Sequence, residues 1–400
     1  MASTRSKTSS TPKKKAAKPA SAGSKSTKKT AFRFYDNRQN YLSFINTCNE
    51  KYAIAKRAGH EFQYLHPTPP ALRMYDAGMG DATVLSACMR DLHQRFPTVP
   101  LVVVAKEISM EDVRIGVDKM VDRFCEHPST ILVLTNLNYA DSRLMPANTT
   151  SAAAMNWQEV RLEGNTTYGY KEQLEALQPM FAHGWETETS KISGNPLFKR
   201  PSVVVIYRED HTILLDAVIP RPGVQSWYYD FVLASQPWRA RTSARFKAEK
   251  IIVPLVKCLA PGGRMLVIQS CGKDPAEEII KEFWPNENPF PVTRHDILRE
   301  FKELMGRELR NYNIRELSDS KAIFSYKMHA LPSEIGSSGI GTSTLFAAWN
   351  AAIYVNQIED ERLEKVLADG TYLIATARVL NKYGGLHFND ETFVITRNKN

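Results

Sequence analysis

An acid and two glycines lie close together where the sequence changes from an extended to a helical pattern. Asp76 follows a short, mostly apolar run, and Gly78 and Gly80 come directly after it. From Thr83 onward, apolar residues recur every three or four positions. This pattern predicts a strand, a tight turn and a helix. Glycines leave room for a ligand, and a helix N-terminus offers free amides and a positive dipole end, so the expected chemistry is binding of a nucleotide-like cofactor.

Two classes of nucleotide cofactor bind to such a turn. Dinucleotides favour G-x-G-x-x-G, but the third glycine is absent here, and the Asp81 carboxylate would repel a pyrophosphate. The turn instead resembles the cofactor loop of class I S-adenosylmethionine-dependent methyltransferases, with Ala82 in place of that family's last glycine. The resemblance implies that the turn binds S-adenosylmethionine through Asp76, Gly78, Gly80 and Asp81. The alternative is a glycine turn without a ligand.

A second acid ends the next predicted strand. The run Leu101–Ala105 is apolar throughout, which is typical of a buried parallel strand, and Glu107 follows it. In strand-helix-strand nucleotide sites, an acid at this place accepts hydrogen bonds from the ribose hydroxyls. A carboxylate suits this role because its hydrogen bonds are roughly twice as strong as neutral ones. We therefore predict that Glu107 binds the ribose of the cofactor.

Polar residues follow a third predicted strand, Ile131–Leu134. In the resembled family, groups after the third strand recognise adenine, which implies this role for Asn136, with Asn138 and Asp141 as alternatives. An Asn that only caps a turn is an equal alternative.

A later, aromatic-rich strand ends at Ser235-Gln236-Pro237-Trp238. Ligands bind beyond the carboxyl ends of parallel strands, so these residues are expected to face the transferred methyl group. The tetrapeptide is similar to the (Asn/Asp/Ser)-Pro-Pro-(Tyr/Phe/Trp) signature of amino-group methyltransferases, although Gln236 replaces the first proline. The resemblance implies catalytic roles for Ser235, Gln236 and Trp238. The alternative is a strand end before a Pro-Trp helix start.

The segment Leu259–Val267 closely resembles the turn that leads into the fifth strand of class I methyltransferases. The family implies an α/β, Rossmann-like, seven-stranded methyltransferase sheet within residues 71–328. Two strands near 312–317 and 322–328 are expected to pair as the closing antiparallel hairpin.

A large insertion, residues 142–226, separates the third and fourth strands. We predict a hairpin at 203–218 within it and a function as a lid or substrate subdomain. Its His183 and His211 are candidates for a base, should the acceptor have to lose a proton.

Three further segments flank this domain. Residues 1–30 carry nine basic and no acidic side chains and predict a disordered tail. Residues 31–70 predict a helical arm, which covers the cofactor in many relatives, and residues 329–400 predict a helical C-terminal addition. Without the tail, the chain carries 43 basic and 43 acidic side chains, so its body is formally neutral.

Composition excludes several other classes. The sequence has no apolar run long enough for a membrane helix, and its five scattered cysteines favour a reducing, cytoplasmic location. No metal-binding motif, serine nucleophile elbow or phosphate-binding lysine loop is present.

The leading hypothesis is a methyltransferase that uses S-adenosylmethionine and a small-molecule acceptor. One alternative is an amino-group methyltransferase that acts on nucleic acid, helped by the basic tail. The others are a non-catalytic interaction module with this fold and a dinucleotide oxidoreductase. The sequence leaves the acceptor and the oligomeric state open.

Overall fold

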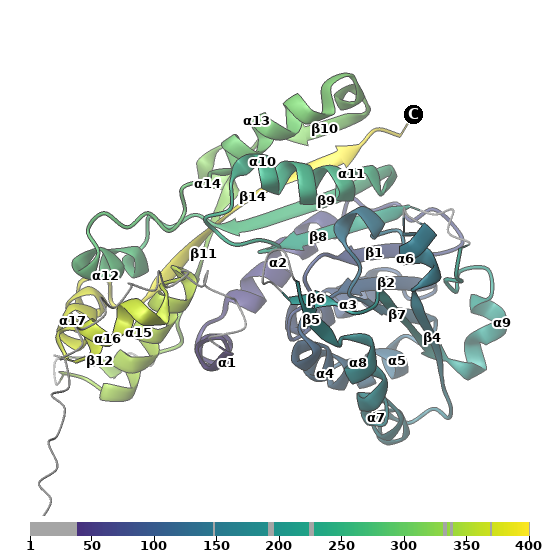
Figure 1. Cartoon of the computed structure of the whole chain (residues 1–400), viewed down its shortest axis with the longest axis horizontal. Helices are drawn as coiled ribbons and strands as arrows, with labels where there is room; N and C mark the ends of the chain where they lie inside the picture. The colour runs from purple at the N-terminus through teal and green to yellow at the C-terminus, as the bar shows by residue number, and fades with distance from the viewer. Residues whose placement is uncertain are drawn as a thin grey trace, which may run out of the picture.

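The computed structural model describes residues 38–146, 149–190, 196–223, 228–330, 334–336, 339–368 and 370–399. Its main feature is one ten-stranded sheet with helices on both faces (Figure 1). The predicted tail, residues 1–30, lies outside the described residues, as do residues 31–37 of the predicted arm.

The strand order is β10-β14-β9-β8-β1-β2-β3-β7-β4, and β11 pairs with the first half of β14. The strands of this sheet are β1 (Leu72–Asp76), β2 (Leu101–Lys106), β3 (Thr130–Thr135), β4 (Asn156–Leu162), β7 (Ser202–Arg208), β8 (Tyr229–Ser235), β9 (Leu259–Ser270), β10 (Tyr312–Arg315), β11 (Ile323–Lys327) and β14 (His387–Arg397). Two short ribbons pair β5 (Thr187–Thr189) with β6 (Pro196–Phe198) and β12 (Ile335–Gly336) with β13 (Gly339–Ile340). Strands β3, β2, β1, β8 and β9 are parallel, which confirms the predicted parallel core.

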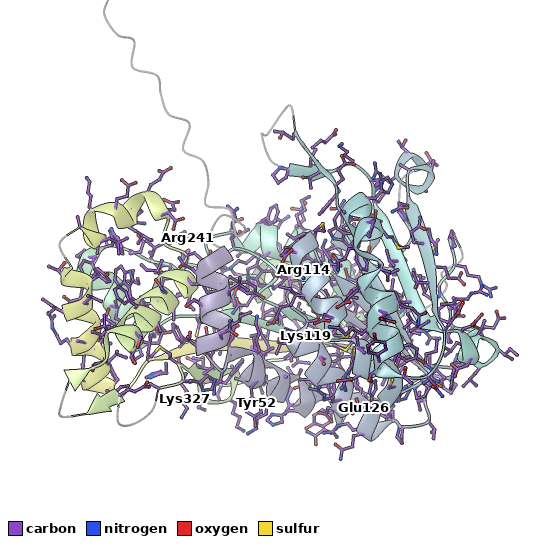
Figure 2. All side chains as sticks on the ribbon, turned by 90° about the horizontal axis from the view of Figure 1, so that it is seen from below. Tyr52, Arg114, Lys119, Glu126, Arg241 and Lys327 are labelled. Atoms are coloured by element: carbon purple, nitrogen blue, oxygen red, sulfur yellow. The ribbon has the colours of Figure 1, made fainter. Side chains whose placement is uncertain are left out.

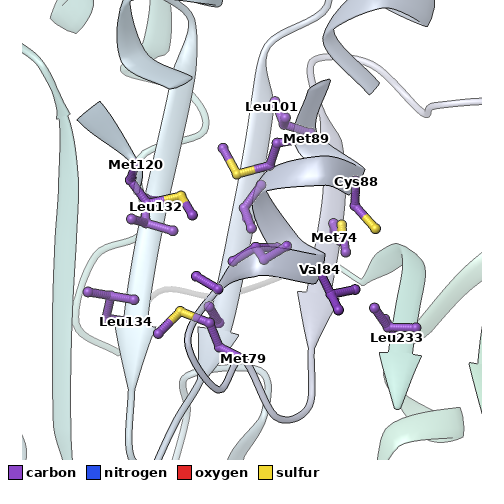
Figure 3. Packing of buried hydrophobic residues seen from close by; sticks show 14 of the residues in the cluster. Met74, Met79, Val84, Cys88, Met89, Leu101, Met120, Leu132, Leu134 and Leu233 are labelled. Carbon is purple, nitrogen blue, oxygen red and sulfur yellow. The ribbon is translucent and has the colours of Figure 1, made fainter. Parts of the chain in front are cut away.

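Side chains of the parallel strands alternate between two cores. Val103 and Ala105 of β2 pack on one face, whereas Val102 and Val104 pack on the other. The first face is covered by α2 (Glu50–Phe62), α3 (Thr83–Arg95), α4 (Met110–Asp118) and α5 (Val121–Glu126). Figure 3 shows the buried side chains between α3 and this face. The second face is covered by α10 (Ala244–Lys247), the π-helical turn η3 (Ala248–Ile252), α11 (Val253–Lys257) and α13 (Arg294–Met305).

Local sequence explains where two helices begin. Thr293 caps α13 and exchanges hydrogen bonds with Asp296, which is a capping box. Asp274 caps α12 (Pro275–Phe283), whose first residue is a proline.

The predicted closing hairpin is wrong in its pairing. Strands β10 and β11 do not pair with each other, because α14 (Asp319–Ala322) separates them and both pair antiparallel with β14. Strand β14 lies between them and β9. It is buried along most of its length, so a central position satisfies more of its apolar side chains than an edge would. The segment 329–400 therefore includes an internal strand of the sheet.

The predicted hairpin in the insertion is also wrong. Residues 203–207 belong to β7, but the expected second arm forms α9 (Thr212–Leu215). Strand β7 pairs antiparallel with β3, and β4 pairs parallel with β7, so the insertion extends the main sheet. It also contains α6 (Thr149–Ala153), α7 (Thr167–Glu175), α8 (Gln178–Gly184) and η2 (Glu209–His211).

A third core lies at the opposite end of the molecule from the insertion (Figure 1). We call it the helical cluster: α1 (Arg38–Thr47), α12, α15 (Thr342–Val355), α16 (Asp360–Leu367) and α17 (Thr371–Tyr383). The remaining turns are η1 (Tyr139–Asp141) and η4 (Gly306–Asn311). Among the described residues, no helix combines the length and hydrophobicity that a membrane span requires.

Candidate active site

A cavity of about 330 Å³ lies at the carboxyl ends of β1, β2, β8 and β9. This is the edge at which open parallel sheets bind ligands. The strand ends contribute Ala77, Gly78, Gly80, Lys106, Glu107, Ser235, Gln236, Pro237, Trp238 and Ser270. Other segments contribute Tyr41, Glu50, Lys51, Ile108, Asp112, Tyr139, Arg239, Tyr326, Tyr354, Val355 and Gln357. The size is in the range of small-molecule sites.

Glu107 is held at the cavity wall by backbone amides. Its Oε2 accepts a hydrogen bond from the Gly80 amide at 2.7 Å, and its Oε1 accepts from the Ile108 and Ser109 amides at 2.6 and 2.8 Å. Burial raises the pKa of Glu107, while these amides act in the opposite direction. A carboxylate oxygen has two lone pairs, so Oε2, which accepts one of these bonds, can still accept a hydroxyl. The arrangement fits the predicted ribose acceptor.

The two glycines of the turn serve different purposes. Gly80 has a φ of 54°, a conformation that favours glycine, and a Cβ there would lie 3.2 Å from the Tyr41 hydroxyl. A Cβ on Gly78 would meet no protein atom closer than 3.9 Å, at the Ser235 carbonyl oxygen. Because Gly78 lines the cavity, that space is open to a ligand.

The two acids of the turn lie behind it. Asp76 Oδ1 accepts a hydrogen bond from the Gly78 amide at 3.2 Å, and burial raises the pKa of Asp76 to about 7. Asp81 forms an ion pair with Lys119 and accepts a hydrogen bond from Thr83 Oγ1 at 2.6 Å. Burial opposes ionisation of Asp81, but these bonds hold its pKa below the ordinary value. Neither acid lines the cavity, so both support the turn from within the protein.

The structure does not bring Asn136 to the cavity. Its Nδ2 donates to the Gly184 carbonyl at 3.0 Å, and its Oδ1 accepts from the Ser202 amide at 2.8 Å. The side chain therefore joins β3 to the insertion, and the predicted contact with adenine is not retained. Of the alternatives, Asn138 and Asp141 do not line the cavity either, whereas Tyr139 between them does.

Gln236 explains why the tetrapeptide differs from the double-proline signature. Its φ is 50°, which proline cannot adopt because its ring fixes φ near −65°. The Gln236 Nε2 donates to Ser270 Oγ at 2.9 Å and to Asp390 Oδ1 at 3.2 Å. Ser235 and Gln236 do line the cavity, but the loop has another conformation than the signature requires. The resemblance to amino-group methyltransferases therefore stops at the residue types.

Trp238 is fixed from behind by a buried network. Its Nε1 donates to Gln269 Oε1 at 3.0 Å, and the same oxygen accepts from Lys247 Nζ at 3.1 Å. Lys247 Nζ also lies 5.3 Å from the centroid of the Trp238 ring system, and burial lowers the pKa of Lys247 to about 8. The ring is thus held in one orientation at the cavity wall.

The wall opposite the strand ends comes from two segments far apart in sequence. Tyr41 of α1 lies against Tyr354 of α15, with ring centroids 5.8 Å apart. Arg241 joins the cluster to the β8 side through hydrogen bonds to the Gln357 carbonyl at 3.0 Å and to Glu287, and Figure 2 shows it beside the cluster. The helical arm of residues 31–70 was expected over the cofactor, but no signal in the sequence pointed to α15.

The insertion contributes no described residue to the cavity lining. Trp185 is its link to the site, because its Nε1 donates to the Glu107 carbonyl at 2.8 Å. His183 contacts Arg200, and His211 pairs with Asp210, away from the cavity. The described residues contain no cluster of three His, Cys, Asp or Glu side chains suited to a metal ion.

These observations define the fold. The antiparallel β14 separates β9 from β10 and β11, and the parallel strands run in the order β3-β2-β1-β8-β9. The chain has the class I methyltransferase fold. Its glycine turn follows the first strand and its acid ends the second, as that fold predicts.

No family model and no curated protein sequence matches the chain. Solved structures of similar shape include a Galdieria sulphuraria protein named as a sarcosine dimethylglycine methyltransferase (8% identity, TM-score 0.35, 87% of this chain and 85% of that one). Another is the cyclopropane synthase MmaA2 from Mycobacterium tuberculosis (11% identity, TM-score 0.32, 91% and 96%). A third is the geranyl diphosphate C-methyltransferase from Streptomyces coelicolor A3(2) (9% identity, TM-score 0.31, 86% and 79%). At these scores, the strand order carries the assignment of the fold.

Proposed function

We propose that this protein is an S-adenosylmethionine-dependent methyltransferase that acts on a small-molecule acceptor. The observation that carries the proposal is the cavity, because it brings Gly78, Glu107 and the Ser235–Trp238 segment together at the strand ends. Helices α1 and α15 cover the cavity, which favours an enclosed small molecule over a nucleic acid as the acceptor.

The chain's own residues would hold and align the reactants. Glu107 Oε2 would accept a hydrogen bond from the ribose, and the open side of Gly78 would admit the rest of the cofactor. When bound, S-adenosylmethionine supplies an electrophilic methyl group on a sulfonium. Ser235 and Trp238 would orient the acceptor along the line of transfer, and the aromatic wall of Tyr41 and Tyr354 would exclude water.

Calorimetric binding of S-adenosylhomocysteine to the wild type, Glu107→Ala and Glu111→Ala tests the proposal. The loss of a charge-assisted hydrogen bond to the ribose in Glu107→Ala should cost about 1.5–3 kcal/mol, or about tenfold in affinity or more. Glu111 pairs with Arg114 on the surface of α4, so Glu111→Ala should bind like the wild type. A folded wild type that binds no S-adenosylhomocysteine contradicts the proposal, and binding of NADH in its place would favour the dinucleotide alternative.

A further inference from the structure

Lys106 is a buried cation in the cavity; the nearby Glu107 carboxylate attracts it, but the two side chains form no ion pair. Its residue is 7% exposed, and it lines the cavity. Within the described ranges, its Nζ has no hydrogen bond or ion pair; the Tyr139 ring lies nearby, with the centroid 5.2 Å from Nζ. Burial lowers the pKa of Lys106 to about 8. A buried, unpaired charge destabilises a protein, so its presence at a ligand site points to a group that binds there.

The neighbouring charges in the cavity differ from Lys106 in this respect. Glu50 pairs with Lys51 at 3.3 Å, and Glu107 accepts three backbone hydrogen bonds. Arg239 is exposed at the cavity wall, where water solvates it. Lys106 is therefore a buried cation of this wall whose ammonium group faces the cavity and forms no ion pair within the described protein.

Two lysines occupy different places in the cavity. Lys51 lies near the glycine turn, because its Nζ is 5.7 Å from the centroid of the Tyr41 ring, and the Tyr41 hydroxyl lies beside Gly80. Lys106 lies between the glycine turn and the Ser235–Trp238 segment, because its neighbour Tyr139 donates from its hydroxyl to the Ala77 carbonyl at 2.9 Å and the Pro237 carbonyl at 3.4 Å. The first position suits the carboxylate of the cofactor, and the second suits the acceptor.

We propose that the methyl acceptor carries an anionic group, a carboxylate or a phosphate, and that Lys106 binds it. This inference rests on the proposed function and narrows its substrate class. An anion at Lys106 would form a charge-assisted hydrogen bond in a site largely shielded from water, where such bonds are strong. It would also fix the orientation of the acceptor relative to Trp238, which in-line methyl transfer requires.

The first test compares the wild type with Lys106→Met, which keeps most of the length of the side chain but removes its charge. The ligand-free variant should melt at or above the wild-type temperature, because a buried unpaired charge has been removed. A lower melting temperature would instead indicate a structural lysine and would overturn the inference. Lys171→Met, in a surface ion pair on α7, is the matched control and should bind ligands like the wild type.

The second test titrates benzoate and benzamide into protein saturated with S-adenosylhomocysteine. The wild type and Lys171→Met should prefer benzoate about tenfold or more, whereas Lys106→Met should show a ratio near one. Phenyl phosphate, compared with phenol, shows whether the site prefers a phosphate. A wild type without preference for either anion, or a preference that survives in Lys106→Met, overturns the inference.

A third measurement shows whether Lys106 binds the anionic group of the acceptor or the carboxylate of the cofactor. If Lys106→Met weakens S-adenosylhomocysteine about tenfold but leaves 5′-methylthioadenosine unchanged, Lys106 binds the cofactor's carboxylate and the inference is wrong. Failure of the proposed function is a separate result: the wild type would not bind S-adenosylhomocysteine, and the acid-to-amide ratio can still be measured in the cofactor-free protein.

Discussion

Two long segments interrupt the methyltransferase sheet, and they affect the cavity in different ways. The insertion after β3 adds β4 and β7 to one end of the sheet and contributes no described residue to the cavity lining. The segment between β11 and β14 forms α15–α17 at the other end and contributes Tyr354, Val355 and Gln357 (Figure 1). The second segment and α1 thus cover the cavity, whereas the lid or substrate role of the insertion stays a prediction.

This difference shows that the size of an inserted segment does not indicate whether it contributes to the cavity. The insertion follows β3 at the edge of the parallel core, so hydrogen-bonding to that edge satisfies its backbone. The second segment must return the chain to β14 in the interior of the sheet, and this path takes it across the strand ends. Which strand a segment connects to thus decides whether it reaches the site.

The largest expected contrast is between two tyrosines, one from each segment. Tyr207→Ala in β7 should destabilise the protein by about 3–5 kcal/mol, because its ring is fully buried, and leave S-adenosylhomocysteine affinity unchanged. Tyr354→Ala should lower that affinity about tenfold, because it opens the aromatic wall. Thermal melts and calorimetry of both variants measure the two effects. If Tyr207→Ala weakened S-adenosylhomocysteine binding and Tyr354→Ala did not, the result would support a lid role for the insertion.

The glycine turn belongs to neither segment. The pH dependence of stability caused by its Asp76 therefore provides a reference for both. Since the pKa of Asp76 is raised to about 7 by burial, its neutral form stabilises the fold below pH 4, and this contribution is lost as the pH rises through 7. The wild type should therefore lose about 1.4 kcal/mol per pH unit relative to Asp76→Asn between pH 4 and 7. Urea unfolding of both proteins at several pH values measures this. A constant difference would mean that Asp76 has an ordinary pKa.

A smaller effect tests how the insertion is attached. Asn136→Ala should cost about 1–3 kcal/mol of stability, because the Ser202 amide and the Gly184 carbonyl lose a buried partner. Its affinity for S-adenosylhomocysteine should stay within about twofold of the wild type. Calorimetry measures this affinity. A tenfold loss of affinity would support the predicted role of Asn136 in adenine binding.

The smallest expected effect concerns the surface contact of the helical cluster. Arg241→Ala removes the bonds to the Gln357 carbonyl and Glu287 and should cost about 1 kcal/mol or less, since the side chain is partly exposed. The matched control is Arg245→Ala, which breaks ion pairs to Glu300 and Glu303 within the other helical layer. A two- to threefold weaker binding of S-adenosylhomocysteine is expected for Arg241→Ala alone.

The parts of the fold that could be predicted have local signals. Continuous apolar runs identified the parallel strands, and the glycine turn and Glu107 were found because both directly follow a strand. The same rule brought Ser235, Gln236 and Trp238 to the cavity wall. The site roles of all these residues stay predictions until binding is measured.

The parts that could not be predicted depend on partners far away in sequence. No local signal indicated which strands lie beside β14, so the closing pair was assigned to β10 and β11. Asn136 had a suitable side chain, but the position of the insertion determined its direction. Likewise, the periodicity of α15 predicted a helix without indicating that Tyr354 faces a ligand site.

The interior position of β14 has a consequence for how the protein reaches its native state. Gln269 of β9 and Glu391 of β14 are hydrogen-bonded although 122 positions separate them. Closing such a long loop is entropically unfavourable, so this pairing should form late during folding. Until then β9 presents an unpaired edge that can associate with other chains. The recovery of native protein from denaturant should therefore fall steeply as the chain concentration rises.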